Sequence, residues 1–252
     1  MITGFAKPLI AIPSPRDLPE FAAAVDKLPA DKLFVKYMRE QQAYDVIRQY
    51  FLTHREYDYL AILPDDLIVT PYHWHQLMSD LHEFNFEVLC GLCNLDISQE
   101  HKGMLNVCVR HLPSRSALTR SYDWLIEGGP EHQAYLDCMD PPIIQVAFAG
   151  FPFMFIRRDV VAQIEFKDDL IWNPHKVSGC CVDVIFTADC HDLGIPIYCD
   201  LRCRMNHLKV DDNIVIGKMT GIKQPEVKFV PFASLLEESE FSHQKKKKNQ
   251  NG

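Results

Sequence analysis

The sequence predicts an α/β fold with a mostly parallel central sheet and helices on both faces of that sheet. Apolar segments of strand length alternate along the chain with segments whose apolar residues recur at helical spacing. The chain has 252 residues, 47% of them hydrophobic, which is enough to bury a sizeable core. Such an alternation is typical of parallel strands joined by crossover helices.

The first half of the chain shows this alternation most clearly. Strands are predicted within residues 7–17, 31–38, 57–63 and 86–93, and helices at 40–54 and 71–84. The first helix has apolar residues at helical spacing, namely Ala43, Val46, Ile47, Tyr50 and Phe51. The second helix begins at Pro71, because proline is favoured in a first turn.

Residues 143–164 predict two more strands and a helix. The first strand has Gly150 in its middle, and a glycine there often marks a bulge or a close approach of the backbone to a ligand. We expect Asp159 to open the helix as its N-cap. The preceding residues, 114–142, are predicted to form a helix and loops.

Residues 180–209 repeat the same architecture. A helix carries Asp183 near its start and is closed by Gly194, which suits the cap position. A strand is predicted at 195–205, and His207 follows it. Because open α/β sheets bind ligands at the carboxyl ends of their strands, His207 is placed where a site is expected.

Composition excludes several classes of protein. The net charge of −8 argues against a general nucleic-acid binder. No run of eighteen apolar residues is present, so we expect no membrane span, and the N-terminus is not a convincing secretory signal. Nine cysteines without such a signal indicate reduced thiols and a cytoplasmic location. A zinc site made by the pairs in "CGLC" and "CDLRC" is the less favoured alternative to buried small side chains.

Residues 236–252 form a polar, lysine-rich tail that we expect to be disordered. The run Lys245 to Lys248 is most simply a solvated end, and as a membrane tether it would hold only weakly. Without an internal repeat or a convincing linker, residues 1–235 are predicted to be a single domain.

The stretch "YDYLAILPDDLIVTP" places Asp65 and Asp66 directly after an apolar strand. One interpretation is a turn that breaks the strand in solvent. The other is a cation site, because two adjacent carboxylates repel each other unless they share a cation or a proton. Carboxylate oxygens suit Mg²⁺ or Mn²⁺, which are commonly bound by one or two carboxylates plus substrate phosphates. The cation interpretation therefore predicts that a diphosphate completes the site.

Four stretches carry a resemblance to a known family: "DYLAILPDDLIVTPYHWHQLM", "CGLC", "GFPFMFIRRDVV" and "VDVIFTADCHDLGIPIYCDLRCRMNH". Together they resemble the GT-A-fold glycosyltransferases of the family-two-like group, in element order over residues 7 to 210. "PDD" resembles the family's Asp-x-Asp signature, with Pro64 in place of the first Asp. "CVDVIF" resembles the family's Glu-Asp pair, with Val182 in place of the Glu. The implied fold is a single-domain, Rossmann-like GT-A fold.

The resemblance implies a metal-dependent glycosyltransferase with a UDP- or GDP-linked sugar donor and a carbohydrate or other hydroxyl acceptor. Mn²⁺ or Mg²⁺ would stabilise the departing diphosphate. Asp66 is the expected direct metal ligand, His207 is a further candidate ligand, and Asp65 would help through water or the donor ribose. Asp183 is the candidate general base, which implies an inverting reaction. The alternatives are a structural histidine for His207 and, for Asp183, a carboxylate stabilised by the helix dipole.

The donor nucleotide is expected at the loop that follows the first strand. Pro13, Ser14 and Arg16 could frame its base and ribose, and Arg39 after the second strand could reach the base or the diphosphate. An exposed salt bridge explains either arginine equally well.

The sugar and acceptor side is expected at Gly150, Phe151 and Trp172, since aromatic faces commonly pack on sugars. The alternative is that the two aromatic residues belong to the core. Two alternative functions also stay open: an inactive nucleotide-sugar-binding or scaffold module, and a metal-dependent nucleotidyltransferase or phosphohydrolase. The nucleotidyltransferase would want glycine in its first loop, and "IPSPRD" has none.

Overall fold

The computed structural model describes residues 6–14, 16, 18–95, 103–110, 124–169, 171–173, 176–178, 181–208 and 224–233. Its first half contains β1 (Pro8–Ser14), α1 (Pro19–Val25), β2 (Asp31–Lys36), α2 (Glu40–Thr53), β3 (Tyr59–Ile62), β4 (Leu67–Ile68), α3 (Pro71–Phe84) and β5 (Val88–Cys93). Its second half contains β6 (Met104–Cys108), β7 (Trp124–Ile126), α4 (Pro130–Cys138), β8 (Ile143–Val146), β9 (Phe148–Ala149), β10 (Met154–Arg157), α5 (Arg158–Gln163), β11 (Ile171–Asn173), β12 (Lys176–Ser178), α6 (Val182–Asp192), β13 (Ile197–His207) and β14 (Glu226–Val230).

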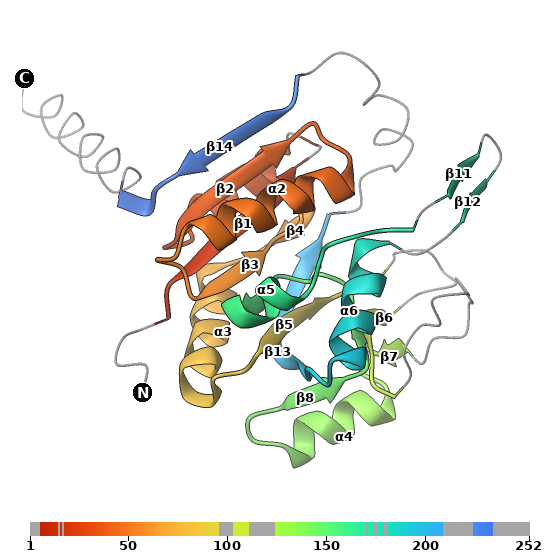
Figure 1. The fold of residues 1–252 in the computed structure, drawn as a ribbon. Helices are drawn as coiled ribbons and strands as arrows, with labels where there is room; N and C mark the ends of the chain where they lie inside the picture. Colours follow the sequence, from red (N-terminus) through yellow and green to blue (C-terminus); the bar gives the residue numbers. More distant parts are fainter. Residues whose placement is uncertain are drawn as a thin grey trace, which may run out of the picture.

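A nine-stranded sheet forms the centre of the fold, in the order β14-β2-β1-β3-β10-β5-β13-β4 with β8 also paired to β13 (Figure 1). β2 and β3 run parallel to β1, and β13 runs parallel to β5. β10 lies antiparallel to both β3 and β5, so β5 points in the same direction as β3. The five strands β1, β2, β3, β5 and β13 therefore all point the same way. β14, β4 and β8 add antiparallel pairings. The α/β prediction is confirmed, and the sheet as a whole is mixed.

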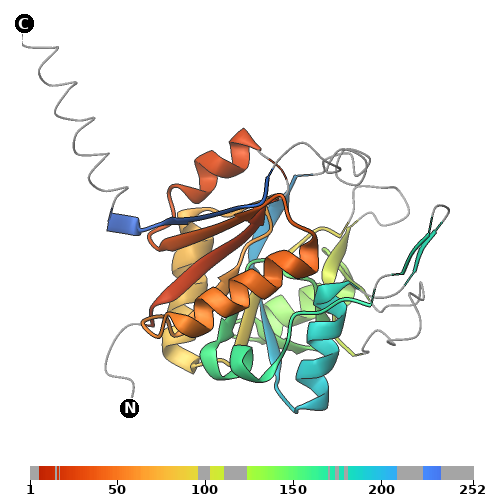
Figure 2. The ribbon, with the colours of Figure 1, turned by 45° about the horizontal axis from the view of Figure 1, so that its top comes forward.

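Helices cover both faces of the sheet, as Figures 1 and 2 show together. Side chains of a strand alternate between its two faces, so β1 contributes to two separate cores. Leu9 and Ala11 join the core beneath α2, α5 and α6. Ile10 and Ile12 join the core beneath α1 and α3. Burial on both faces explains why these strands read as continuous apolar runs.

The long helices α2 and α3 form where the spacing predicted them. α3 begins at Pro71, and the Thr70 N–H before it is capped by Nδ1 of His73 at 3.2 Å. It ends at Asn85, whose φ of 51° is the left-handed conformation that asparagine tolerates better than most residues. α6 ends near Gly194, which has φ of 70°, so the predicted role of this glycine at the helix end is confirmed.

Three local predictions are corrected. Gly150 lies just after β9 and not in mid-strand, because the ladder ends with its N–H bond to the Asn106 carbonyl. Asp159 is not the N-cap of α5; that position is Arg157, and the Asp159 carboxylate is held by the Arg157 guanidinium at 2.7 Å. His207 is the last residue of β13, because the strand is extended by pairing with β4.

The cysteine pairs of "CGLC" and "CDLRC" do not converge. Cys90 and Cys199 are buried in the core beneath α2, whereas Cys93 and Cys203 are buried on the opposite face of the sheet. None of the four is in a disulfide, and they fill space as small apolar side chains. The zinc alternative therefore has no support in the described residues.

A buried charged cluster fastens α3 to β13. Asp80 on α3 and Asp200 on β13 are 3% and 0% exposed, and the Arg202 guanidinium contacts both at 2.9 Å. Burial, and then the neighbouring Asp200, raise the pKa of Asp80 to about 7. The cluster lies where the register of β13 against β5 shifts, between Cys199 and Arg204. It thereby supports the irregular strand that ends at the carboxyl edge of the sheet.

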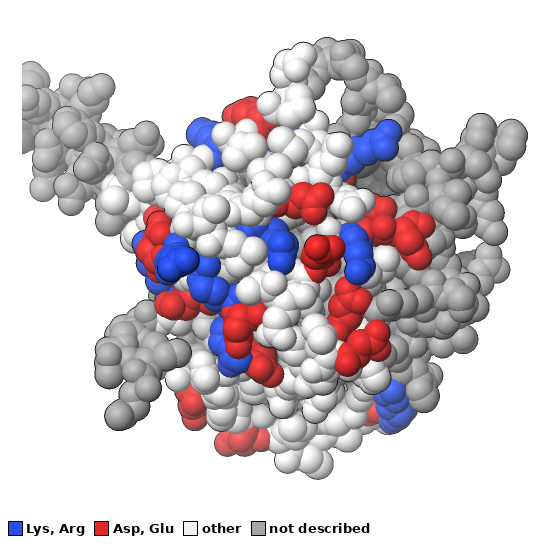
Figure 3. Space-filling model, in the orientation of Figure 1, with Lys and Arg blue, Asp and Glu red and all other residues white. Residues whose placement is uncertain are grey.

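The surface drawn in Figure 3 carries basic and acidic side chains side by side over its described part. Neither sign forms a continuous field on the described part of this face. Among the described helices, α1 to α6, none has both the length and the apolar character needed to cross a bilayer. The predicted tail, 236–252, lies outside the described residues.

Gly91→Ala is expected to lower the free energy of unfolding by about 3 kcal/mol, because an added Cβ would lie 2.5 Å from Met205 Cε and 2.6 Å from the Cys203 carbonyl oxygen. Urea denaturation measures this loss. Gly194→Ala is the matched control. An added Cβ at Gly194 would lie in open space, so only the left-handed backbone conformation would lower the free energy of unfolding, by about 1 kcal/mol. Equal losses in the two variants would contradict the close packing at Gly91.

Candidate functional site

Four strands bring polar groups together at the carboxyl edge of the sheet. Arg16 follows the end of β1, Asp65 and Asp66 follow β3, and Asn94 follows β5. His207 ends β13 and pairs with Leu67 of β4, directly beside Asp66. Because these strands point the same way, their polar ends meet although they are far apart in sequence.

Asp65 is a buried carboxylate that is held by Arg16. It is 1% exposed, its Oδ2 accepts the Arg16 backbone N–H at 3.0 Å, and its Oδ1 accepts Nε at 3.0 Å as well as a bond from Nη2. Burial raises the pKa of Asp65, and Arg16 offsets only part of that effect. The Asp-Asp dipeptide does form a turn, but Asp65 is not in solvent.

Asp66 lies between two cationic or potentially cationic groups. Its Oδ2 is 3.0 Å from Arg16 Nη2 and 3.1 Å from His207 Nε2. Burial alone would raise the pKa of Asp66, but His207, with Arg16, outweighs burial and lowers it. Asp66 is therefore the carboxylate of the pair whose charge is favoured by its surroundings.

The Asn94 carbonyl fixes the orientation of the His207 ring. His207 Nδ1 lies 2.9 Å from this carbonyl oxygen, which can only accept, so Nδ1 carries a proton. Nε2 then faces Asp66 Oδ2 at 3.1 Å, and this contact is satisfied either by a proton on Nε2 or by a cation between the two atoms. Metal-binding histidines are commonly oriented in this way, by a bond from the other ring nitrogen to a carbonyl.

The spacing of Asp66 and His207 fits two ligands of one divalent ion. Neighbouring ligands of an octahedral ion with bonds of about 2.1 Å lie roughly 3 Å apart. Asp65 fits less well as a direct ligand, because Arg16 occupies both of its oxygens. Within the described ranges, no group of three or more His, Cys, Asp or Glu side chains is arranged to hold a metal. A metal would thus take its other ligands from substrate phosphate and water.

Asp183 lies in the first turn of α6, as predicted, near Gly150. Its Oδ1 accepts the Val184 N–H at 2.8 Å. Burial raises the pKa of Asp183 to about 6, although backbone N–H bonds act in the opposite direction. A Cβ on Gly150 would lie 3.2 Å from Asp183 Oδ2 and 3.3 Å from Asn106 Nδ2. The glycine therefore lets a carboxylate and an amide approach the backbone more closely than a side chain would comfortably allow.

A further carboxylate, Glu40, lies within electrostatic reach of Asp183. Glu40 begins α2 at the exposed rim of this edge. Partial desolvation by the surrounding chain, followed by the charges of Asp183 and Asp168, raises the pKa of Glu40 to about 7. Sequence analysis did not single out Glu40, Asn94 or Asn106, although an asparagine within the apolar strand "MLNVC" is a signal that could have indicated Asn106.

The other predicted binding residues are spread more widely. Pro13 and Ser14 end β1, opposite Val35 and Lys36 of β2. Arg39 is the N-cap residue of α2, on the side of the sheet where β2 ends. Each lies at the carboxyl edge, so a role in donor binding stays a prediction.

The two predicted aromatic contacts have different outcomes. Phe151 is 7% exposed, and its ring packs against Tyr44, Phe166 and Phe186 at centroid distances of 5.4, 6.1 and 5.5 Å. It is therefore a core residue, and the prediction of a sugar contact is corrected. Trp172 lies in the two-stranded β11–β12 sheet, which projects away from the nine-stranded sheet in Figures 1 and 2, and its role stays a prediction.

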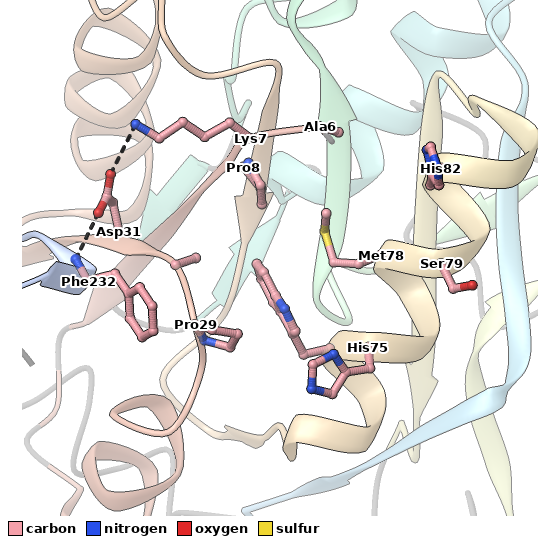
Figure 4. A pocket seen from close by; sticks show the side chains of 12 residues that line it. Ala6, Lys7, Pro8, Pro29, Asp31, His75, Met78, Ser79, His82 and Phe232 are labelled. Carbon is pink, nitrogen blue, oxygen red and sulfur yellow. Dashed lines mark hydrogen bonds and ion pairs between the residues drawn. The ribbon is translucent and has the colours of Figure 1, made fainter. Parts of the chain in front are cut away.

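A pocket of about 710 Å³ lies at the opposite, amino edge of the sheet (Figure 4). Met78 and His75 of α3 line it together with Phe232. Asp31 closes one side by pairing with Lys7 at 3.5 Å and accepting the Phe232 N–H at 2.8 Å. These charges neutralise each other, and the predicted catalytic groups lie at the other end of the strands, so this pocket is separate from the candidate site.

No family model matches the chain, and no curated protein matches it. Among solved structures it is similar to A197 from STIV, with 18% sequence identity, a TM-score of 0.48, and coverage of 82% of this chain and 87% of that chain. This similarity is too distant to inform on function.

Asp183→Asn is expected to stabilise the protein at pH 8 by on the order of 1–3 kcal/mol. The folded-state pKa of about 6 lies above that of an unfolded aspartate, so the charged form is disfavoured in the folded protein. The charge of Asp183 therefore lowers the free energy of unfolding by its full amount above pH 6 and not at all at low pH. The stabilisation by Asp183→Asn should accordingly be smaller at pH 5 than at pH 8. Urea denaturation at both pH values measures it.

Asp192→Asn, at the exposed far end of α6, is the control for this experiment and should change stability by only about 0.5 kcal/mol or less. A gain at Asp183 that did not depend on pH would show that burial of charge is not its cause.

Proposed function

We propose that the chain is a metal-dependent glycosyltransferase with a single GT-A-type domain. It would move a sugar from a nucleotide-diphosphate donor to an acceptor hydroxyl with inversion. The observation that carries this proposal is the placement of Asp66 and His207, 3.1 Å apart, at the same sheet edge as Asp183. A pair of metal ligands beside a carboxylate of raised pKa is the minimum set for this reaction.

Asp66 and His207 would hold the Mn²⁺ or Mg²⁺, and that ion supplies positive charge to the leaving diphosphate. The chain prepares both ligands before any ion binds. The Asn94 carbonyl fixes the ring of His207, and the surroundings of Asp66 favour its ionised form. Arg16, at 3.0 Å from Asp66, adds a guanidinium that can also contact a phosphate.

Asp183 would act as the general base. Its Oδ2 takes the proton of the acceptor hydroxyl while the hydroxyl oxygen forms its bond to the anomeric carbon. The bond between that carbon and the diphosphate oxygen breaks, and its electron pair leaves with the diphosphate. A pKa of about 6 keeps Asp183 ionised at neutral pH and makes it a stronger base than an ordinary aspartate. A cytoplasmic location completes this proposal.

The second candidate is a nucleotide-sugar-binding module that needs no metal. Arg16 favours it, because its guanidinium already bonds to Asp65 and contacts Asp66 at 3.0 Å. An internal cation in this position could neutralise the two carboxylates and leave the diphosphate to other groups. The two candidates therefore differ in whether nucleotide binding depends on a divalent ion.

Calorimetric titration with UDP, GDP, CDP and dTDP, each with and without Mn²⁺, separates these candidates. For the transferase, one nucleotide should bind at least tenfold more tightly with Mn²⁺, and Asp66→Ala and His207→Ala should remove that gain because each deletes a metal ligand. Asp192→Asn and His75→Ala, both exposed and away from the site, are matched controls. Binding without metal dependence would favour the binding module, and no binding by any nucleotide would refute both candidates.

Turnover should fall with pH as Asp183 is protonated. We expect release of nucleotide diphosphate from the donor to decline below about pH 6, approaching tenfold per pH unit, because only the carboxylate accepts the proton. Glu40, with its own raised pKa, and Asp168 face the same region and contribute charge to this profile. Asp183→Asn should lower turnover by on the order of 10²-fold or more while nucleotide affinity is kept. A variant that kept full turnover would exclude Asp183 as the base.

A further inference from the structure

We propose that two copies of the chain associate by antiparallel pairing of their β14 strands, about a two-fold axis at Val227. β14 lies at one end of the nine-stranded sheet, with β2 as its neighbour, as Figures 1 and 2 show. The association does not depend on the proposed function, because β14 contributes no residue to the candidate site.

β14 is an edge strand. On its inner side it pairs with β2 throughout, from Glu226 opposite Lys36 to Val230 opposite Lys32. Among the described strands, only β2 pairs with it. Successive residues of an antiparallel strand direct their N–H and C=O groups to opposite sides, so part of the β14 backbone is directed away from β2. Such an edge is a template for a strand of another chain.

The side chains on one face of β14 are apolar and exposed. Val227 and Phe229 are 48% and 38% exposed, whereas Val35, which lies opposite Val227 on β2, is 1% exposed. The Phe229 ring packs on Tyr50 of α2 at a centroid distance of 5.8 Å, so this face lies on the α2 side of the sheet. The apolar layer of that side therefore continues to the edge of the sheet and does not end at a polar strand.

Two-fold symmetry and charge select one register. In a two-fold pair of strands the axis passes through a residue that lies opposite its own copy. An axis at Lys228 would place two lysines opposite each other, and an axis at Glu226 two glutamates, which destabilises the pair. An axis at Phe229 or Val230 would pair no opposite charges. An axis at Val227 places Glu226 opposite the partner's Lys228, and this ion pair occurs twice.

This register also joins the apolar layers of the two copies. On the α2 side it forms a row of four valines, Val35 and Val227 of one copy followed by the same two residues of the other. Phe229 then lies opposite the partner's Pro225. A proline is tolerated there, because it only borders the strand and its missing N–H shortens the ladder without interrupting it.

The opposite side of β14 is complementary in charge. Glu226 and Lys228 are both exposed, and Glu226 lies opposite Lys36 on β2. In the two-fold pair each Glu226 is flanked by Lys36 of its own chain and by the partner's Lys228. Charges of alternating sign thus run across the joined sheets, and opposite-charge neighbours stabilise adjacent strands.

The alternative is that Lys228 and Pro225 block the edge, since natural proteins use lysine and proline for that purpose. A blocked edge would leave the chain monomeric. Blocking explains neither the exposed apolar pair Val227 and Phe229 nor the glutamate two residues before Lys228, which supplies the lysine with a partner in a second copy.

Analytical ultracentrifugation of the full-length chain, from about 1 to 200 µM, tests the association. A pair of five-residue strands buries less surface than a standard stable interface, so we expect a reversible dimer with a Kd on the order of 10 µM. Lys228→Glu places two carboxylates opposite each other, and Glu226→Lys places two ammonium groups opposite each other. Each variant alone should dimerise at least tenfold more weakly than the wild type.

An equimolar mixture of these two variants is the decisive sample. One variant then supplies only positive charges to the facing pairs and the other only negative charges, so a mixed dimer should form with a Kd within about threefold of the wild type. Glu83→Lys, at the exposed end of α3, changes the net charge by as much as Glu226→Lys and should leave dimerisation unchanged.

Cross-linking gives a second readout if a charge variant does not fold. In the proposed register Val227→Cys brings two thiols directly opposite each other, and mild oxidation should join the two chains. Phe229→Cys, on the same face of the strand, is the matched control and should form no more cross-linked dimer than the wild type.

Three results would overturn the two-fold pair. The first is a wild-type chain that stays monomeric at 200 µM. The second is a dimer that neither charge reversal weakens, because it would form through another surface. The third is a cross-link at Phe229→Cys without one at Val227→Cys, because the register would be different. Each of these results leaves the proposed transferase untouched.

Discussion

The ion pair between Arg16 and Asp65 is the interaction on which the geometry of the carboxyl edge depends. Asp65 is 1% exposed, and a buried carboxylate without a partner would cost several kcal/mol. Arg16 meets that need with its backbone N–H and its guanidinium together, which ties the loop after β1 to the turn after β3. The same guanidinium contacts Asp66 at 3.0 Å, so the structural pair also sets the position of the candidate metal ligand.

The opposite side of Asp66 is supported from β13. This strand must reach the edge with His207 in register, and the Asp80–Arg202–Asp200 cluster supports its irregular middle. In each of the two clusters one arginine contacts two carboxylates. Burial raises the pKa of Asp80 to about 7, whereas for Asp66 the effect of burial is outweighed by His207 and Arg16, which lower its pKa. Favouring the ionised form of one carboxylate, and burying the others, is what a selective cation site requires.

Much of the fold could be predicted from the sequence, because burying one face of a helix or strand makes apolar residues recur at a fixed spacing. The spacing in 40–54 and 71–84 predicted α2 and α3, and the Asp pair was correctly placed at a strand end. The reversed direction of β10 was not readable, since strand polarity leaves no mark on hydrophobic periodicity. Phe151 shows a similar limit, because an aromatic residue looks the same in a core as against a sugar. Asn94 contributes only a backbone carbonyl, which no side-chain pattern can reveal.

The acceptor side of the site keeps a locally unfavourable charge. Burial opposes the ionised form of Asp183, whose carboxylate lies so close to Gly150 that a Cβ there would be 3.2 Å from Oδ2. Selection for stability alone would replace this aspartate by an amide. A ligand that donates a hydrogen bond to the carboxylate explains why the charge is kept, and an acceptor hydroxyl group is such a donor.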